Sequence, residues 1–138
     1  MRYLTALLLG LVFLATVGCS GFVFFSSNGT LLVAVTINPT VGNPINFPNN
    51  TVPFVATGSF SGATNAVTLT NVLWTVESPF FSNGVQNSGH ASIDQNGNAT
   101  CATAFTGSVQ VFATVPANSS QPVSFTNNKV ASATLVCP

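Results

Sequence analysis

The chain has 138 residues, of which 46% are hydrophobic and 10% aromatic, but only 3% are charged, and its formal net charge is zero. This length allows one domain, and the hydrophobic content excludes a disordered chain. The scarcity of charge excludes a surface that steers polyanions or neutralises phosphates, so we expect no nucleic-acid partner. Asn, Ser, Thr and Gln, which together exceed a third of the residues, must make the surface polar.

The N-terminus has the pattern of an export signal. Arg2 supplies a positive start, residues 4–17 form an apolar run, and small residues follow. This pattern predicts a targeting segment. It could be an ordinary secretion signal, a retained membrane helix or, more specifically, the signal of a lipoprotein.

Residues 14–19, LATVGC, resemble the lipobox of bacterial lipoproteins, in which the cysteine becomes the lipidated first residue of the mature protein. Thr16 departs from that pattern, which usually has leucine there. The resemblance implies a signal peptide over residues 1–18, lipidation of Cys19 and a lipid-anchored tether over residues 19–30. More than one acyl chain on the cysteine would hold the protein durably on a membrane. A serine follows the cysteine, which resembles the pattern for outer-membrane sorting.

Short strands separated by turns follow the tether. In residues 52–60, Val52, Phe54, Ala56 and Phe60 share one face, which is typical of a half-buried strand. Residues 40–50 contain two prolines and several asparagines and predict a loop or a broken edge segment. The other strands are expected at residues 31–37, 67–69, 72–77, 90–93, 99–103, 108–115 and 130–137.

About seven short strands without a sustained helical period predict an all-β domain over residues 31–138, built as a β-sandwich. Trp74 is large enough to fill the centre between two sheets. Gly97 provides the positive φ of a tight hairpin turn, and Asp94 can bond backbone amides within that turn.

Three cysteines in an exported chain leave one without a disulfide partner. If Cys19 carries lipid, Cys101 and Cys137 form a natural pair in an oxidising compartment. Such a disulfide would stabilise the fold by about 4 kcal/mol on chain-entropy grounds. The alternative, a metal site made by the two thiols and His90, has poor ligand spacing, and we expect no metal.

Catalytic chemistry has few candidates. Ser88, His90 and Asp94 are the one place where a hydroxyl, an imidazole and a carboxylate lie close in sequence. An extended strand would put the imidazole and the carboxylate about 13 Å apart, at about 3.3 Å per residue, too far for a triad. Glu77 and Asp94, the two acids after the signal segment, show no pattern of a glycosidase pair. We therefore expect no enzyme activity and no cofactor.

The loop from Ser78 to Gly89 carries Phe80 and Phe81 as its main apolar content. Loops at one end of a sandwich often recognise partners, so these rings form a possible binding site. The alternative is that both rings fold back onto the rim of the sandwich.

The order of these motifs resembles the bacterial immunoglobulin-like domain, group 2, of invasin- and intimin-type adhesins. Trp74-Thr75, the turn at residues 93–97 and the glycine-led strand at residues 107–111 match that family's motifs. The resemblance covers residues 31–115. The insertion PFFSNGVQNSG and the cysteine pair depart from the family. The resemblance implies an Ig-like Greek-key sandwich with structural, spacer or adhesive work.

The sequence thus predicts a lipid-anchored, non-catalytic Ig-like module in the bacterial cell envelope, at the outer membrane or cell surface. Its expected partners are the membrane and an envelope protein or glycan. A carbohydrate- or peptide-binding module that uses the loop from Ser78 to Gly89 is the alternative, and a small periplasmic hydrolase is a third, less favoured one.

Overall fold

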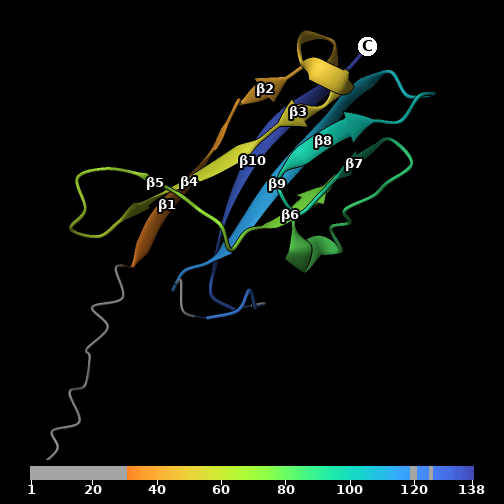
Figure 1. Cartoon of the computed structure of the whole chain (residues 1–138). Coiled ribbons are helices and arrows are strands. Elements are labelled where there is room, and N and C mark those ends of the chain that lie inside the picture. The colour runs from red at the N-terminus through yellow and green to blue at the C-terminus, as the bar shows by residue number, and fades with distance from the viewer. Residues whose placement is uncertain (1–30, 119–120, 125) are drawn as a thin grey trace, which may run out of the picture.

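A computed structural model of the chain describes residues 31–118, 121–124 and 126–138 (Figure 1). The predicted signal peptide, tether and lipidated Cys19 lie outside these residues. The described residues form ten strands and three short 3₁₀ helices and contain no α-helix, which confirms the all-β prediction. Within these ranges no helix is long and apolar enough to cross a membrane.

The predicted strand regions all contain strands, whereas β2 (Val41–Gly42) and the three 3₁₀ helices were not predicted and lie in segments expected to be loops or a broken edge. The elements are β1 (Leu32–Asn38), β2 (Val41–Gly42), η1 (Pro44–Asn46), η2 (Pro48–Asn50), β3 (Val52–Pro53), β4 (Val55–Phe60), β5 (Val67–Thr68), β6 (Leu73–Val76), η3 (Phe80–Ser82), β7 (Ala91–Ile93), β8 (Asn98–Cys101), β9 (Gly107–Pro116) and β10 (Asn128–Cys137).

The strands form three sheets, with the orders β1-β4-β5, β2-β10-β9-β6 and β3-β8-β7. The longest pair, β9 with β10, keeps one antiparallel register from Asn128↔Pro116 to Cys137↔Gly107. The structure has more strands than predicted in part because the expected strand over residues 52–60 is divided into β3 and β4. Phe54 alone separates them, and its amide donates to the Gly97 carbonyl at 2.9 Å.

The core contains the apolar faces that alternation predicts. Phe54 is fully buried in the middle of the 52–60 segment, and Trp74 is only 3% exposed. This confirms that the indole is an interior group. In β9 the alternate residues are all buried: Val109, Val111, Ala113 and Val115.

Two threonines are buried against the alternating pattern: Thr114, between Ala113 and Val115 in β9, is 0% exposed, and Thr75 in β6 is the other. Thr75, on the opposite face of β6 from Trp74, is only 2% exposed. Its hydroxyl donates to the Ser78 carbonyl at 2.8 Å, and Gly84 lies so close that a Cβ there would be 2.9 Å from the Thr75 Cβ. The loop that follows β6 therefore folds back and covers this residue, which strand alternation cannot predict.

The same loop passes from one sheet to another. The Val76 amide donates to the Val85 carbonyl at 2.7 Å, so the loop first pairs with the edge of the four-stranded sheet. The Ile93 amide then donates to the Gln86 carbonyl at 2.8 Å, and Asn87 pairs with Ser92 at the edge of the β3-β8-β7 sheet. Residues 78–89 therefore pair with strand edges of both sheets.

The structure joins Cys101 in β8 to Cys137 in β10 by a disulfide, as the cysteine count predicted. The two residues are 36 positions apart in sequence and belong to different sheets. Closing a loop of this length stabilises the folded state by about 4 kcal/mol in the chain-entropy account.

Candidate functional site

The turn between β7 and β8 holds one of the two described carboxylates. Asp94 Oδ1 accepts bonds from the amides of Asn96 (2.9 Å) and Asn98 (2.8 Å), and Oδ2 accepts one from the Asn98 side chain (2.9 Å). Gly97 has a φ of 83°. Both expectations for this turn are confirmed.

These contacts set the protonation of the carboxylate. Partial burial raises the pKa of Asp94, but the hydrogen bonds from Asn98 and then Asn96 outweigh it and hold the pKa below its ordinary value. Asp94 is therefore an ionised structural group, and its acceptor sites are occupied by the turn.

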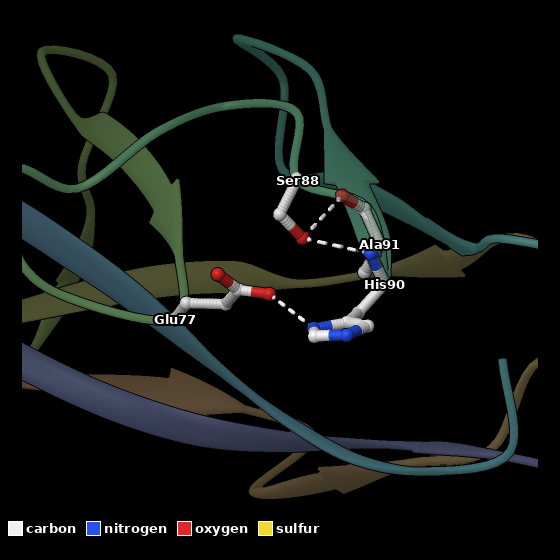
Figure 2. Close-up of polar contacts among 4 residues, drawn as sticks. All are labelled: Glu77, Ser88, His90 and Ala91. Carbon is white, nitrogen blue, oxygen red and sulfur yellow. Dashed lines mark hydrogen bonds and ion pairs between the residues drawn. The ribbon is translucent and has the colours of Figure 1, made fainter.

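The second carboxylate makes the one ion pair of the described residues. His90 Nδ1 lies 2.6 Å from Glu77 Oε1 (Figure 2), and both side chains are well exposed, at 54% and 41%. Sequence reasoning grouped His90 with Ser88 and Asp94 instead. The pairing with Glu77 was missed.

Two local features bring the pair together. Glu77 follows β6 with a left-handed φ of 69°, and its amide donates to the Gln110 carbonyl at 2.8 Å. His90 immediately precedes β7, and its ring packs against that of Phe105 with centroids 4.4 Å apart and a tilt of 37°. The two residues thus flank the 78–89 loop and join its ends. One feature of the sequence could have indicated this pair: the single histidine and one of the two acidic residues lie at the two ends of the same loop.

The Ser88 hydroxyl belongs to the same cluster but has a backbone role. It accepts bonds from the amides of His90 and Ala91, both at 3.1 Å, and donates to the Ala91 carbonyl at 3.2 Å (Figure 2). Its single proton can also turn toward Glu77. Hydrogen bonding from Ser88, and then from His90, lowers the pKa of the Glu77 carboxyl, against a smaller desolvation effect.

This arrangement does not have the geometry of a nucleophilic triad. A triad needs the serine hydroxyl to donate to one imidazole nitrogen while the carboxylate holds the other. Here the carboxylate contacts His90, as in a triad, but the hydroxyl of Ser88 is bonded to the backbone of Ala91. The cluster can therefore hold the loop closed, but it has no activated nucleophile.

The described residues contain no group of three His, Cys, Asp or Glu side chains that could hold a metal ion. The two carboxylates also have separate partners, His90 for Glu77 and the turn amides for Asp94. The contacts of the described residues therefore tie each carboxylate to a different part of the structure.

The two phenylalanines of the loop have different environments. Both lie in η3, but Phe80 is half-buried whereas Phe81 is 52% exposed. Phe80 is therefore partly covered by the rest of the domain, whereas the Phe81 ring is open to solvent. A binding role for Phe80 and Phe81 stays a prediction.

No protein-family model matches this sequence, and none of the curated proteins is significantly similar to it. What the comparisons and the structure together support is the class: a small all-β domain of several sheets with an internal disulfide.

Proposed function

We propose that the protein is a lipid-anchored, non-catalytic Ig-like module with a structural, spacer or adhesive role in the bacterial cell envelope. Its partners are the membrane, through lipid on Cys19, and an envelope protein or glycan. The observation that carries this proposal is the pattern of strand pairing, because it agrees with the motif order on which the family resemblance depends.

The pairing supports an Ig-like sandwich in the following way. Because only Phe54 separates β3 from β4, the two small sheets share one extended segment. They can be read as one layer of β1, the joined β3–β4, β8 and β7. The second layer is the β2-β10-β9-β6 sheet, in which β2 pairs with β10 in parallel. Trp74 and Phe54, one from each layer, are both buried in the core between them.

Export is supported by the cysteines. Disulfides form and persist in oxidising compartments outside the cytoplasm. With Cys101 and Cys137 joined, Cys19 is the one cysteine left for lipid attachment.

The proposed absence of catalysis is supported by the contacts that the ionisable groups already make. Glu77 and His90 bond to each other at the ends of the loop, and Asp94 holds its turn. Lys129 is the remaining charged residue among those described. In the interactions of this part of the chain, none of these groups is placed to activate a nucleophile.

The mass of the mature protein tests the proposal. The full-length gene product would be expressed in a double-membraned bacterium and its N-terminal peptide identified after membrane fractionation. We expect a diacylglyceryl-modified Cys19 at the N-terminus, and we expect Cys19→Ala to leave the membrane fraction. An intact Met1, or an unmodified Cys19, would overturn the lipid anchor.

A second candidate function is binding through the 78–89 loop. The observation that favours it is the 52% exposure of Phe81 at the loop surface. An exposed aromatic ring on a loop tied at both ends is a suitable contact group. Phe81→Ala would then reduce binding to a partner without changing stability.

A further inference from the structure

A groove of about 820 Å³ lies on one face of β3, β8 and β7. Alternate residues of these strands, Val52, Ala99 and Ile93, are buried in the core. The groove is lined by the other face of the sheet, with η2 on one side and residues 86–87 of the loop on the other. It is therefore a shallow trough with a β-sheet floor and two loop walls.

The groove offers neutral hydrogen-bonding groups. On its floor Ser92 Oγ and Thr100 Oγ1 lie 2.8 Å apart and bond to each other. On its walls the side-chain amides of Asn49, Gln86 and Asn87 make no hydrogen bond to other residues in the described ranges. Each amide provides both donors and acceptors, so the walls can bond a ligand that carries both.

The charge of the residues that line the groove limits the chemical class of ligand that it can bind. Asp94 is the one charged residue in the lining, and its oxygens already accept three bonds from the turn. No lysine, arginine or histidine among the described residues lines the groove, so phosphates and carboxylates would find no counter-charge. The rings of Pro48 and Pro53 add small apolar surfaces. This combination suits a pyranose, which has hydroxyl groups at its edge and C–H groups on its faces.

An extended peptide fits less well. Peptides that bind sheets usually add a strand to an open edge. The edge of β7 is already taken, because the Ile93 amide bonds to Gln86 and Asn87 pairs with Ser92. The groove therefore offers a ligand side chains on the face of the sheet rather than backbone groups at the β7 edge.

The loop wall is held in place before any ligand arrives. Backbone pairing fixes Gln86 and Asn87 against β7, and the Glu77–His90 contact ties the ends of the loop together. A wall that is already ordered loses less conformational entropy on binding than a mobile loop would.

We propose that this groove is a binding site for a neutral glycan, with the amides of Asn49, Gln86 and Asn87 as the contact groups. This inference rests on the second candidate function, because both assume that the module works by binding a partner. It places the contact surface in the groove, on the walls formed by η2 and by residues 86–87, instead of at the phenylalanines of the loop.

The test uses the full-length protein in detergent micelles. The probes are three neutral polysaccharides (a β-1,4-glucan, an α-mannan and a dextran), acidic polygalacturonate, and an array of unstructured peptides. We expect binding to at least one neutral polysaccharide and none to polygalacturonate. Binding to peptides alone, to polygalacturonate alone, or to none of these probes would overturn the proposal.

Variants locate the contact surface. The double variant Gln86→Ala, Asn87→Ala is expected to weaken binding at least tenfold, as the loss of two hydrogen bonds implies. A matched pair outside the groove, Asn46→Ala with Gln121→Ala, is expected to leave affinity within twofold. Asn49→Gly, on the opposite wall, removes the amide at a position whose φ of 56° suits glycine, and it gives an independent measurement if the double variant does not fold.

Two results would separate the proposals. If Phe81→Ala abolishes binding while the groove variants do not, the site is the loop surface and the groove proposal is wrong. Lipid on Cys19 is measured by mass and does not depend on glycan binding, so failure of the anchor and failure of the groove are distinguishable.

Discussion

Two glycines with nearly the same φ allow a sharp test of how the 94–98 turn packs. Gly97 has a φ of 83° and Gly62 a φ of 78°, so alanine is strained at both positions. They differ in surroundings. A Cβ on Gly97 would lie 2.3 Å from the Phe54 carbonyl oxygen and 3.0 Å from the Trp74 ring, whereas a Cβ on Gly62 would meet nothing within 4 Å.

The expected losses of stability in the two alanine variants follow from this difference in surroundings. The left-handed conformation costs an L-residue roughly 1–2 kcal/mol, partly offset by about 0.4–1 kcal/mol from the stiffer unfolded chain. Gly62→Ala should therefore destabilise by about 1 kcal/mol. Gly97→Ala adds overpacking against backbone and indole, about 1–3 kcal/mol, for a total of about 3 kcal/mol. For a domain of this size these losses lower Tm by about 5 °C and about 15 °C.

The assay is thermal and urea unfolding of the full-length protein with its disulfide intact, followed by the fluorescence of Trp74, the single tryptophan. We also expect a change in the native emission of Gly97→Ala, because the added methyl group touches the indole. Equal losses of stability in the two variants would refute the packing of this turn against Trp74.

Three further predictions concern stability. Replacing both Cys101 and Cys137 by serine should lower the free energy of unfolding by about 4 kcal/mol, measured by urea unfolding. Glu77→Gln should lower stability at neutral pH by less than about 1 kcal/mol, because the ion pair is exposed. The folded-state pKa of Glu77 is depressed, so its contribution is present above the ordinary glutamate pKa and is lost as pH falls through the folded pKa. Phe54→Ala should cost about 3–5 kcal/mol, whereas Phe81→Ala should leave Tm nearly unchanged.

Each of these has a control and a contrary outcome. The serine variant is compared with the reduced wild type, which should have the same stability. The Glu77→Gln variant and the wild type should converge once the pH is below the folded pKa of Glu77, and a stability difference that persists there would contradict this role of the carboxylate. A Phe81→Ala variant as unstable as Phe54→Ala would contradict the exposure assigned to that ring.

Much of the fold could be predicted from local patterns. In the first half of β9 polarity alternates with burial, because Val109 and Val111 are buried whereas Gln110 between them is exposed. The turn at Asp94 and Gly97 was predictable because each residue type has a specific backbone role there. The Cys101–Cys137 disulfide was predictable from the number of cysteines, once Cys19 was assigned to lipid.

Several of the missed features depend on where the 78–89 loop runs. Thr75 is buried because this loop covers the outer face of β6. Glu77 meets His90 because the loop returns to its starting point. No local period encodes such a path, since it is fixed by backbone pairing with strand edges in two sheets. The groove beside the loop could not be predicted for the same reason.

The position of the disulfide decides how this module would respond to mechanical tension. The start of β1 and the C-terminal end lie at opposite ends of the molecule (Figure 1). Pulling them apart would slide the parallel strands β2 and β10 past each other, so their hydrogen bonds, including Thr134 N to the Thr40 carbonyl, would resist in shear. Cys137 lies at the end of β10 and is covalently bound to β8. Force entering there would pass into the β3-β8-β7 sheet through a covalent bond as well as through hydrogen bonds, so the two sheets would share the load.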